Sequence, residues 1–408
     1  MTSNRTRTIF AILDSIVTVI VTALIEIEFH FSWGCVKFDL VHIGRMDSRD
    51  RPDDLPDYAA AVERPPDYQT VKIATSTLLA AIREARGTER AIAMNLAHDA
   101  RPGPANQFCL FLKPWTTHSG ADLEDILHLV LERAAAHDLV VEQAAVLPGR
   151  YVARQALMAR HYWRMVGFAR TGAAGFTSAI RASFEEMFTC SAEEAVILGG
   201  FEMLDRFPAM SPFALEVLWE NVPQQRLGNS VTCARVTIDG ADLFLINGFV
   251  PNLLATYEIP DNVVTVLSLT GPLPWRDARQ SFVGATDPMR AVPGSLRRLL
   301  FERRRELGID IRLGANGVHL SSGPLESLIE LRRLLPATGS EECRAITEFR
   351  LGRKLIETLG AQATMALLDD PGVVANGRRQ ELFDLTEEMD EDAVVALLSS
   401  GVVQPPLA

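Results

Sequence analysis

Apolar residues follow two distinct spacings in the middle of the chain. Residues 108–112 (FCLFL) and 139–147 (LVVEQAAVL) are short, nearly continuous apolar runs of the length expected for buried strands. Between them, residues 120–138 repeat apolar positions at helical intervals, which is typical of an amphipathic helix. The pattern predicts a strand, a helix and a second strand in close succession.

Similar runs continue on both sides of this segment. Residues 234–248 and 262–271 are rich in β-branched and apolar residues and predict further strands. Residues 151–207 have helical spacing, as does the acidic stretch after residue 336. Ahead of the central segment, residues 70–96 predict a strand followed by a helix. Strands and helices are therefore interspersed along most of the chain.

Residues 9–25 form a strongly apolar run that fits two interpretations. The run follows Arg5 and Arg7, as a signal anchor does, but Asp14 interrupts it and it is short for a span of about 20 apolar residues. β-branched residues dominate positions 16–22, so a buried strand or hairpin fits as well. Both interpretations stay open, and membrane contact is the less favoured one.

Turn-forming residues divide the chain into parts. Residues 46–69 are rich in Pro, Asp and Arg and have the character of a linker, and residues 98–107 form a second break. We therefore expect an N-terminal extension over 1–104, a central domain over 105–335 and an acidic, helical C-terminal extension over 336–408.

Composition narrows the class of protein. The net charge of −12 argues against nucleic-acid binding and against binding to anionic membranes. The five cysteines are scattered and contain no C-x-x-C pair, which favours a reducing compartment and argues against a cysteine zinc site. We expect a cytoplasmic protein with no metal held by its own side chains. Only four lysines occur among the 40 basic residues, so Lys113 at the end of a predicted strand stands out.

Two loops contain residues suited to phosphate chemistry. Residues 284–297 (GATDPMRAVPGSLR) combine glycines, prolines and arginines and predict an ordered loop that turns into a helix. A hydroxyl near a helix start and an arginine on its first turn can receive a phosphate. Residues 316–327 (NGVHLSSGPLES) place His319 among turn-forming residues. Taken alone, either segment also fits an ordinary surface loop.

Together, these segments resemble the signature of nucleoside diphosphate kinases. The first matches the family's G-x-T-x-P-x-x-A-x-P-G-x-x-R, and the second matches N-x-x-H-x-S within its N-x-x-H-G-S-D. The predicted strand at 108–112 runs into Lys113 and a proline, as the family's opening strand does. The resemblance covers roughly residues 105–150 and 260–335.

The resemblance implies an α+β fold with a ferredoxin-like βαββαβ core. It also implies ping-pong phosphoryl transfer through a phosphohistidine, with ATP or another nucleoside triphosphate and Mg²⁺. By position, His319 is the nucleophile, Lys113 contacts phosphates, and Glu330 orients the histidine, with Glu326 as the alternative for that last role. The nucleotide-binding residues that the resemblance implies are Lys113, Thr286, Arg297, Asn316, Arg279 and Tyr162.

The chain also departs from the family pattern. Gln280 occupies the position of a family arginine, with Arg279 beside it, and Leu320 and Ser322 replace a glycine and an aspartate. The long separation between the matching pieces implies a mostly helical insertion at about 165–258. Family members form homo-oligomers, but the insertion and the terminal extensions can block that packing, so a homo-oligomer is possible and the oligomeric state stays open. The alternative to an active kinase is a nucleotide-binding regulatory or scaffold protein with a weak or inactive site.

Overall fold

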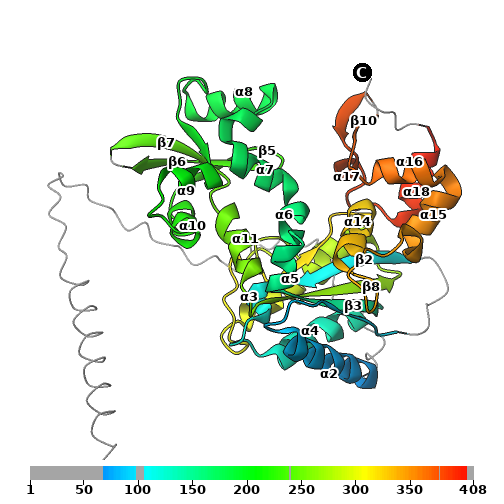
Figure 1. Ribbon diagram of the computed structural model, residues 1–408. Helices are drawn as coiled ribbons and strands as arrows, with labels where there is room; N and C mark the ends of the chain where they lie inside the picture. Colours follow the sequence, from blue (N-terminus) through cyan, green and yellow to red (C-terminus); the bar gives the residue numbers. More distant parts are fainter. Residues whose placement is uncertain (1–67, 98–104, 239, 376, 402–408) are drawn as a thin grey trace, which may run out of the picture. The chain divides into compact units, whose positions relative to one another are not determined.

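The computed structural model describes residues 68–97, 105–238, 240–375 and 377–401 (Figure 1). The apolar run at 9–25 lies outside these residues. Within the described ranges, no helix combines the length and the apolar character that crossing a membrane requires. The described chain is a mixed α+β structure of many helices and mainly antiparallel sheets.

The larger sheet has five strands, and each neighbouring pair in it is antiparallel. Across the sheet, the strands are β1 (Ile92–Asn95), β3 (Val140–Pro148), β8 (Val263–Gly271), β2 (Asn106–Leu112) and β9 (Val318–Leu320). Every residue of β2 and β8 is buried. Since helices cover both faces of these central strands, their sequences are near-continuous apolar runs.

Two apolar cores lie on the two faces of this sheet (Figure 1). Phe108, Leu110 and Leu112 belong to one core, and Cys109 and Phe111 to the other, because successive strand residues point to opposite faces. The first core includes side chains of α2 (Tyr68–Ala85), α4 (Leu123–Ala136) and α13 (Leu296–Glu302). The second includes side chains of α5 (Gly149–Arg154), α6 (Leu157–His161), α7 (Trp163–Thr171), α11 (Val250–Glu258), α14 (Pro324–Leu334) and α15 (Arg350–Leu359).

The order of elements before residue 97 differs from the sequence prediction. A strand followed by a helix was expected over 70–96, whereas the structure has α2 first and the strand β1 after it. Val71, Leu78, Ile82 and Ala85 are buried at helical spacing along α2 and pack in the core shared with α4. The apolar periodicity over the whole segment therefore outweighs the β-branched residues at its start.

A second sheet lies between β3 and β8 in the sequence. Its strands, in order, are β4 (Ile197–Gly199), β7 (Ala241–Ile246), β6 (Val231–Ile238) and β5 (Gln224–Gly228), with β4 parallel to β7 and the other pairs antiparallel. Around it lie η2 (Gly172–Gly175), α8 (Ser178–Phe188), α9 (Gly200–Arg206) and α10 (Pro212–Glu220). The segment at 165–258, expected to be mostly helical, thus combines helices with a sheet that has apolar clusters of its own.

The C-terminal residues are tied to the end of strand β2. Asp390 accepts hydrogen bonds from Asn106 Nδ2 at 2.9 Å and from the backbone N–H of Trp275 at 2.8 Å. Glu391 accepts from the backbone N–H of Gln107 at 2.8 Å. The elements of this region are η4 (Ile346–Glu348), α15, α16 (Ala361–Leu367), the hairpin of β10 (Gly372–Ala375) and β11 (Arg378–Glu381), α17 (Leu382–Leu385) and α18 (Glu391–Ser399). The extension therefore contains a hairpin in addition to helices.

Candidate functional site

One cavity of about 600 Å³ collects residues from distant parts of the sequence. The chain reaches it at the start of α3 (Pro114–Thr117), at the junction of α6 and α7, in η3 (Ala278–Val283, after α12 at Trp275–Asp277), in the loop at 284–297 and at β9. Its lining includes Lys113, Tyr162, Arg279, Thr286, Arg297, Asn316 and His319. These are the nucleotide-binding residues and the histidine that the sequence analysis singled out. We refer to this space as the phosphate cavity, after the role that the sequence resemblance implies for its lining residues.

Three of these residues form a continuous hydrogen-bonded chain. Lys113 Nζ donates to Asn316 Oδ1 at 2.9 Å, and Asn316 Nδ2 donates to the carbonyl oxygen of Thr286 at 3.1 Å. The backbone N–H of Lys113 also donates to the carbonyl of Gly317 at 2.9 Å. Pairing between β2 and β9 brings these segments together, with Phe111 opposite His319. The sheet therefore sets the position of Lys113 relative to the segment at 316–327, which contains His319 and is called the histidine loop below.

Arg297 is the second residue of α13, and it contacts backbone oxygens. The loop that leads into this helix, from Gly284 on, is called the signature loop below. Its guanidinium donates to the carbonyls of Gly284 at 2.7 Å and Val318 at 3.2 Å. Its Nε is buried without a hydrogen-bond partner among the described residues. The arginine thereby joins the signature loop to β9 and keeps its charge at the cavity.

Lys113 and Arg297 are cations with no ion-pair partner among the described residues. Within the described part of the chain, neither residue forms an ion pair with an acidic side chain. Burial, and then the charge of Arg297, lower the pKa of Lys113 to about 7. Burial, and then the charge of Arg279, lower the pKa of Arg297 to about 10. An anion bound between the two cations would supply the missing charge.

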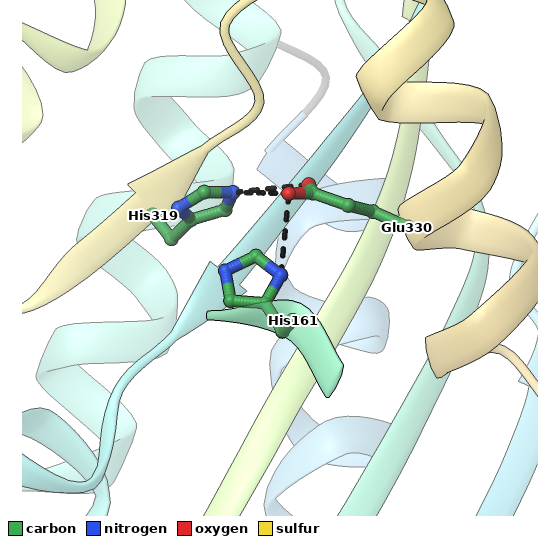
Figure 2. Close-up of side chains that lie close together, drawn as sticks. All are labelled: His161, His319 and Glu330. Atoms are coloured by element: carbon green, nitrogen blue, oxygen red, sulfur yellow. Dashed lines mark hydrogen bonds and ion pairs between the residues drawn. The ribbon is translucent and has the colours of Figure 1, made fainter. Parts of the chain in front are cut away.

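His319 is held from two sides. Its ring stacks on Phe111, with centroids 4.4 Å apart and planes 19° apart. Its Nε2 lies 3.0 and 3.1 Å from the two carboxylate oxygens of Glu330, and the other ring nitrogen points away from Glu330 (Figure 2). Burial, opposed by Glu326 and reinforced by Lys113, lowers the pKa of His319 to about 3. The imidazole is therefore neutral near pH 7, while 17% of the side-chain surface remains exposed.

Glu330 is buried on α14 and contacts several polar side chains. Besides His319, it accepts a hydrogen bond from Ser321 Oγ at 2.5 Å and lies 3.3 Å from His161 Nδ1 (Figure 2). Burial raises the pKa of Glu330, whereas His161 and the Ser321 hydroxyl act to lower it. Glu326, one turn earlier, instead accepts from the backbone N–H and the hydroxyl of Ser322. The structure thus pairs Glu330, and not Glu326, with the histidine.

Sequence reasoning missed His161, and it assigned no role to Ser321, the serine of the N-x-x-H-x-S match. His161 lies at the end of α6, and its ring is perpendicular to that of His319, with centroids 4.8 Å apart. The available signal was its position directly before Tyr162. Tyr162 itself lies at the cavity, where its hydroxyl is 3.3 Å from that of Tyr257 and burial raises its pKa.

Arg279, the neighbour of Gln280, already has acidic partners. Arg279 donates to the carbonyl of Ser322 at 3.2 Å and to the carboxylate of Glu387, and its Nε lies 3.8 Å from Glu388. Gln280 also lines the phosphate cavity, as does Glu388. The acidic turn after α17 therefore competes with any phosphate for this guanidinium.

A second cavity of about 730 Å³ lies on the Glu330 side of the histidine. It shares His319 and Tyr162 with the phosphate cavity. Its other lining residues come from the histidine loop and α14, from the segment between β3 and β8, and from the C-terminal region; they include His161, Arg164, Arg226, Glu326, Glu330, Arg333, Asp370, Asp384 and Glu387. His319 thus stands in the wall between two spaces.

No protein-family model matches the chain, and no curated protein matches it.

Proposed function

We propose that the protein is a phosphotransferase of the nucleoside diphosphate kinase type. It moves the γ-phosphate of a nucleoside triphosphate through a phosphohistidine at His319 to a nucleoside diphosphate or a related acceptor. The observation that carries this proposal is the pair of cations at Lys113 and Arg297, which have no described acidic partner and line the same cavity as a neutral histidine.

The sheet supports the same proposal. Four of its strands occur in the chain order β2, β3, β8 and β9, with α4 after β2 and α13 before β9, and they lie side by side as β3, β8, β2 and β9, with each neighbouring pair antiparallel. This order supports the ferredoxin-like βαββαβ core that the sequence resemblance implies. The strand β1 adds a fifth member at the edge beside β3.

The hydrogen bonds of His319 assign roles to its two ring nitrogens. An ionised Glu330 accepts the proton of Nε2, which leaves the lone pair of Nδ1 free to attack. A bond forms from Nδ1 to the γ-phosphorus as the bond to the β-phosphate oxygen breaks, and the diphosphate leaves. Nε2 keeps its proton, and Glu330 stabilises the positive charge of the phosphorylated ring. An acceptor oxygen then takes the phosphoryl group and restores the neutral histidine.

The cavity walls suit the charge of such a reaction. Phosphoryl transfer depends on positioning and on stabilising negative charge at the phosphate oxygens. Lys113 and Arg297 supply fixed positive charge, and the Lys113–Asn316 hydrogen bond holds the ammonium group in place. Because the pKa of Lys113 is about 7, an approaching phosphate would convert it to the fully charged form.

The side chains of the cavity do not form a magnesium cage. Glu388 is the carboxylate among its described lining residues, whereas a protein site for a hard cation needs several oxygen ligands. Mg²⁺ therefore fits this site as a companion of the nucleotide phosphates, whose charge it neutralises. The cationic side chains fit the remaining phosphate oxygens.

Two observations favour a second function. Arg279 is paired with Glu387 and Glu388, and the bulky Leu320 lines the cavity at a position where the family has glycine. Both features weaken the phosphate site relative to the family pattern. A nucleotide-binding regulatory protein without turnover is the function they support.

Phosphoenzyme formation separates the two functions. The protein is incubated with γ-labelled ATP and Mg²⁺, and the label is tested for stability in acid and in alkali. We expect an acid-labile, alkali-stable phosphoenzyme that is absent in His319→Ala and present in His128→Ala, a control histidine on α4 outside the cavity lining. A wild-type protein that binds nucleotide and takes up no label would overturn the kinase proposal in favour of the regulatory function.

A further inference from the structure

We propose that His161, His319 and Glu330 form a binding site for a divalent transition-metal ion of the Zn²⁺ type, and that this ion switches off phosphorylation of His319. The metal site stands on its own geometry. The inhibitory effect rests on the proposed phosphotransferase function.

The three side chains already have a spacing close to that of metal ligands. The distances from Glu330 to His319 Nε2 are 3.0 and 3.1 Å, and the distance to His161 Nδ1 is 3.3 Å (Figure 2). A tetrahedral zinc site with bonds of about 2.0–2.1 Å places its ligand atoms roughly 3.3–3.4 Å apart. All three ligand atoms lie within 4.8 Å of one another, so a modest ring movement would close the site.

The types of ligand select the class of ion. Two imidazoles and one carboxylate are a donor set that zinc and neighbouring transition metals prefer. Mg²⁺ takes oxygen ligands and retains water, so the same set would bind it poorly. The inferred ion is therefore distinct from the Mg²⁺ that accompanies a nucleotide. From the sequence, no metal held by side chains was expected, since the cysteines are scattered and Mg²⁺ was assigned to the nucleotide phosphates. His161 is distant in the sequence from the other two residues and was not considered.

Two carboxylates lie at this site. Glu330 contacts both histidines, and Glu326 lies one turn earlier on α14 and lines the same cavity of about 730 Å³. Arg333 also lines this cavity, and its side chain donates to the carbonyl of Arg160. A dication bound by Glu330 would offset the negative charge of the two carboxylates.

An ion can reach the site without entering the phosphate cavity. His161, His319 and Glu330 all line the second cavity of about 730 Å³, which Arg226 and Asp384 also line. Solvent in that space would complete the coordination of an ion held by three protein ligands.

Metal binding and phosphorylation require different tautomers of His319. A metal ion takes the lone pair of Nε2, so the ring proton moves to Nδ1. Nδ1–H has no lone pair for attack on phosphorus, and Glu330 now binds the ion instead of the Nε2 proton. His161 undergoes the complementary change, with its proton on Nε2 and its Nδ1 on the metal. The ion and the phosphoryl group therefore exclude each other.

Metal binding is tested first, without nucleotide. Co²⁺ is titrated into the protein, and visible absorption is followed because low-coordinate Co²⁺ absorbs far more strongly than the aqueous ion. We expect saturation at one ion per chain, displacement by Zn²⁺, and affinity lowered by more than about a hundredfold in His161→Ala, since even loss of an outer-shell partner costs roughly 10–100-fold. His128→Ala should bind like wild type. Absence of a saturable signal in the folded wild-type protein would overturn the metal site.

Inhibition is tested separately. Wild-type protein loaded with one equivalent of Zn²⁺ and freed of excess metal is given γ-labelled ATP and Mg²⁺. We expect at least a tenfold slower labelling of His319 than in metal-free protein, with recovery after chelation. The His161→Ala protein, treated in the same way, should lose this Zn²⁺ effect. Equal labelling of loaded and metal-free wild type would overturn the inhibition. If metal-free wild type takes no label but binds Co²⁺, the phosphotransferase proposal fails and the metal site stands.

Discussion

The ammonium group of Lys113 lies 2.9 Å from the side-chain oxygen of Asn316, and the two residues are 203 positions apart in the sequence. Asn316 provides a neutral partner, and the charge of Arg297 adds to burial in lowering the pKa of Lys113. The lysine is therefore held in a position where its charged form is poorly stabilised until an anion arrives.

Nucleotide binding should be accompanied by proton uptake at Lys113. With a pKa of about 7, the lysine is mostly neutral at pH 8, and bound phosphate raises its pKa by favouring the charged form. We expect uptake approaching one proton at pH 8 and little at pH 6, and affinity that falls as pH rises above 7. Calorimetry in buffers with different ionisation enthalpies measures this uptake. Lys113→Met should abolish it, and an uptake that is equal at both pH values would contradict the assignment.

Removal of the Glu330 charge should slow phosphorylation without unfolding the protein. In Glu330→Gln, the group that accepts the Nε2 proton loses its charge, so we expect the labelling rate to fall on the order of 10²-fold. Thermal stability should stay constant or rise, because a buried carboxylate is replaced by a neutral amide of the same shape. Rapid-quench labelling and thermal unfolding measure the two effects.

Glu326→Gln is the matched control for this experiment. Glu326 bonds to Ser322 and not to His319, so its loss should slow labelling much less. Equal effects of the two substitutions would show that general charge near the histidine matters, and not the contact with Glu330.

Release of Arg279 should strengthen nucleotide binding. The double substitution of Glu387→Gln and Glu388→Gln removes the acidic partners of Arg279 and lowers the negative charge at both cavities. Because these groups are partly exposed, we expect a modest fall in the KM for nucleotide, about two- to fivefold. The gain should shrink at high salt and disappear when Arg279→Ala is added. A higher KM in the double variant would mean that the acidic turn helps to form the site.

Loss of Asp390 should destabilise the protein by loosening the C-terminal region. Asp390→Ala leaves the N–H of Trp275 without its acceptor and removes one of the two acceptors of Asn106 Nδ2, the other being the carbonyl of Leu273, at a cost of about 1–3 kcal/mol in the free energy of unfolding. Urea denaturation measures this cost. The exposed Asp392, which pairs with Lys354 at 2.7 Å, is the control, and Asp392→Ala should cost about 1 kcal/mol or less. Similar losses in both variants would argue against a specific anchor at Asp390.

The local elements near the site follow well from the sequence. The apolar runs at 108–112 and 139–147 and the amphipathic segment between them correspond to β2, β3 and α4. The runs at 234–248 and 262–271 correspond to the β6–β7 pair and to β8. The prediction for 70–96 was wrong in the order of its elements, because short β-branched runs resemble strands until the full helical period is considered.

The sequence by itself determined which residue types stand at strand ends and in turns: Lys113 after a buried strand, and Arg297 on a first helical turn. Spacing alone was enough for this, because neighbouring residues share one local backbone geometry. The sequence also predicted His319 in a loop of turn-forming residues, whereas the structure places this residue in the short strand β9, paired with Phe111. Only the tertiary structure decided that Glu330 and not Glu326 contacts His319. It also decided that His161 contacts the carboxylate of Glu330. The chain path brings His161 from α6 against a helix more than 160 residues later, through contacts that no local pattern encodes.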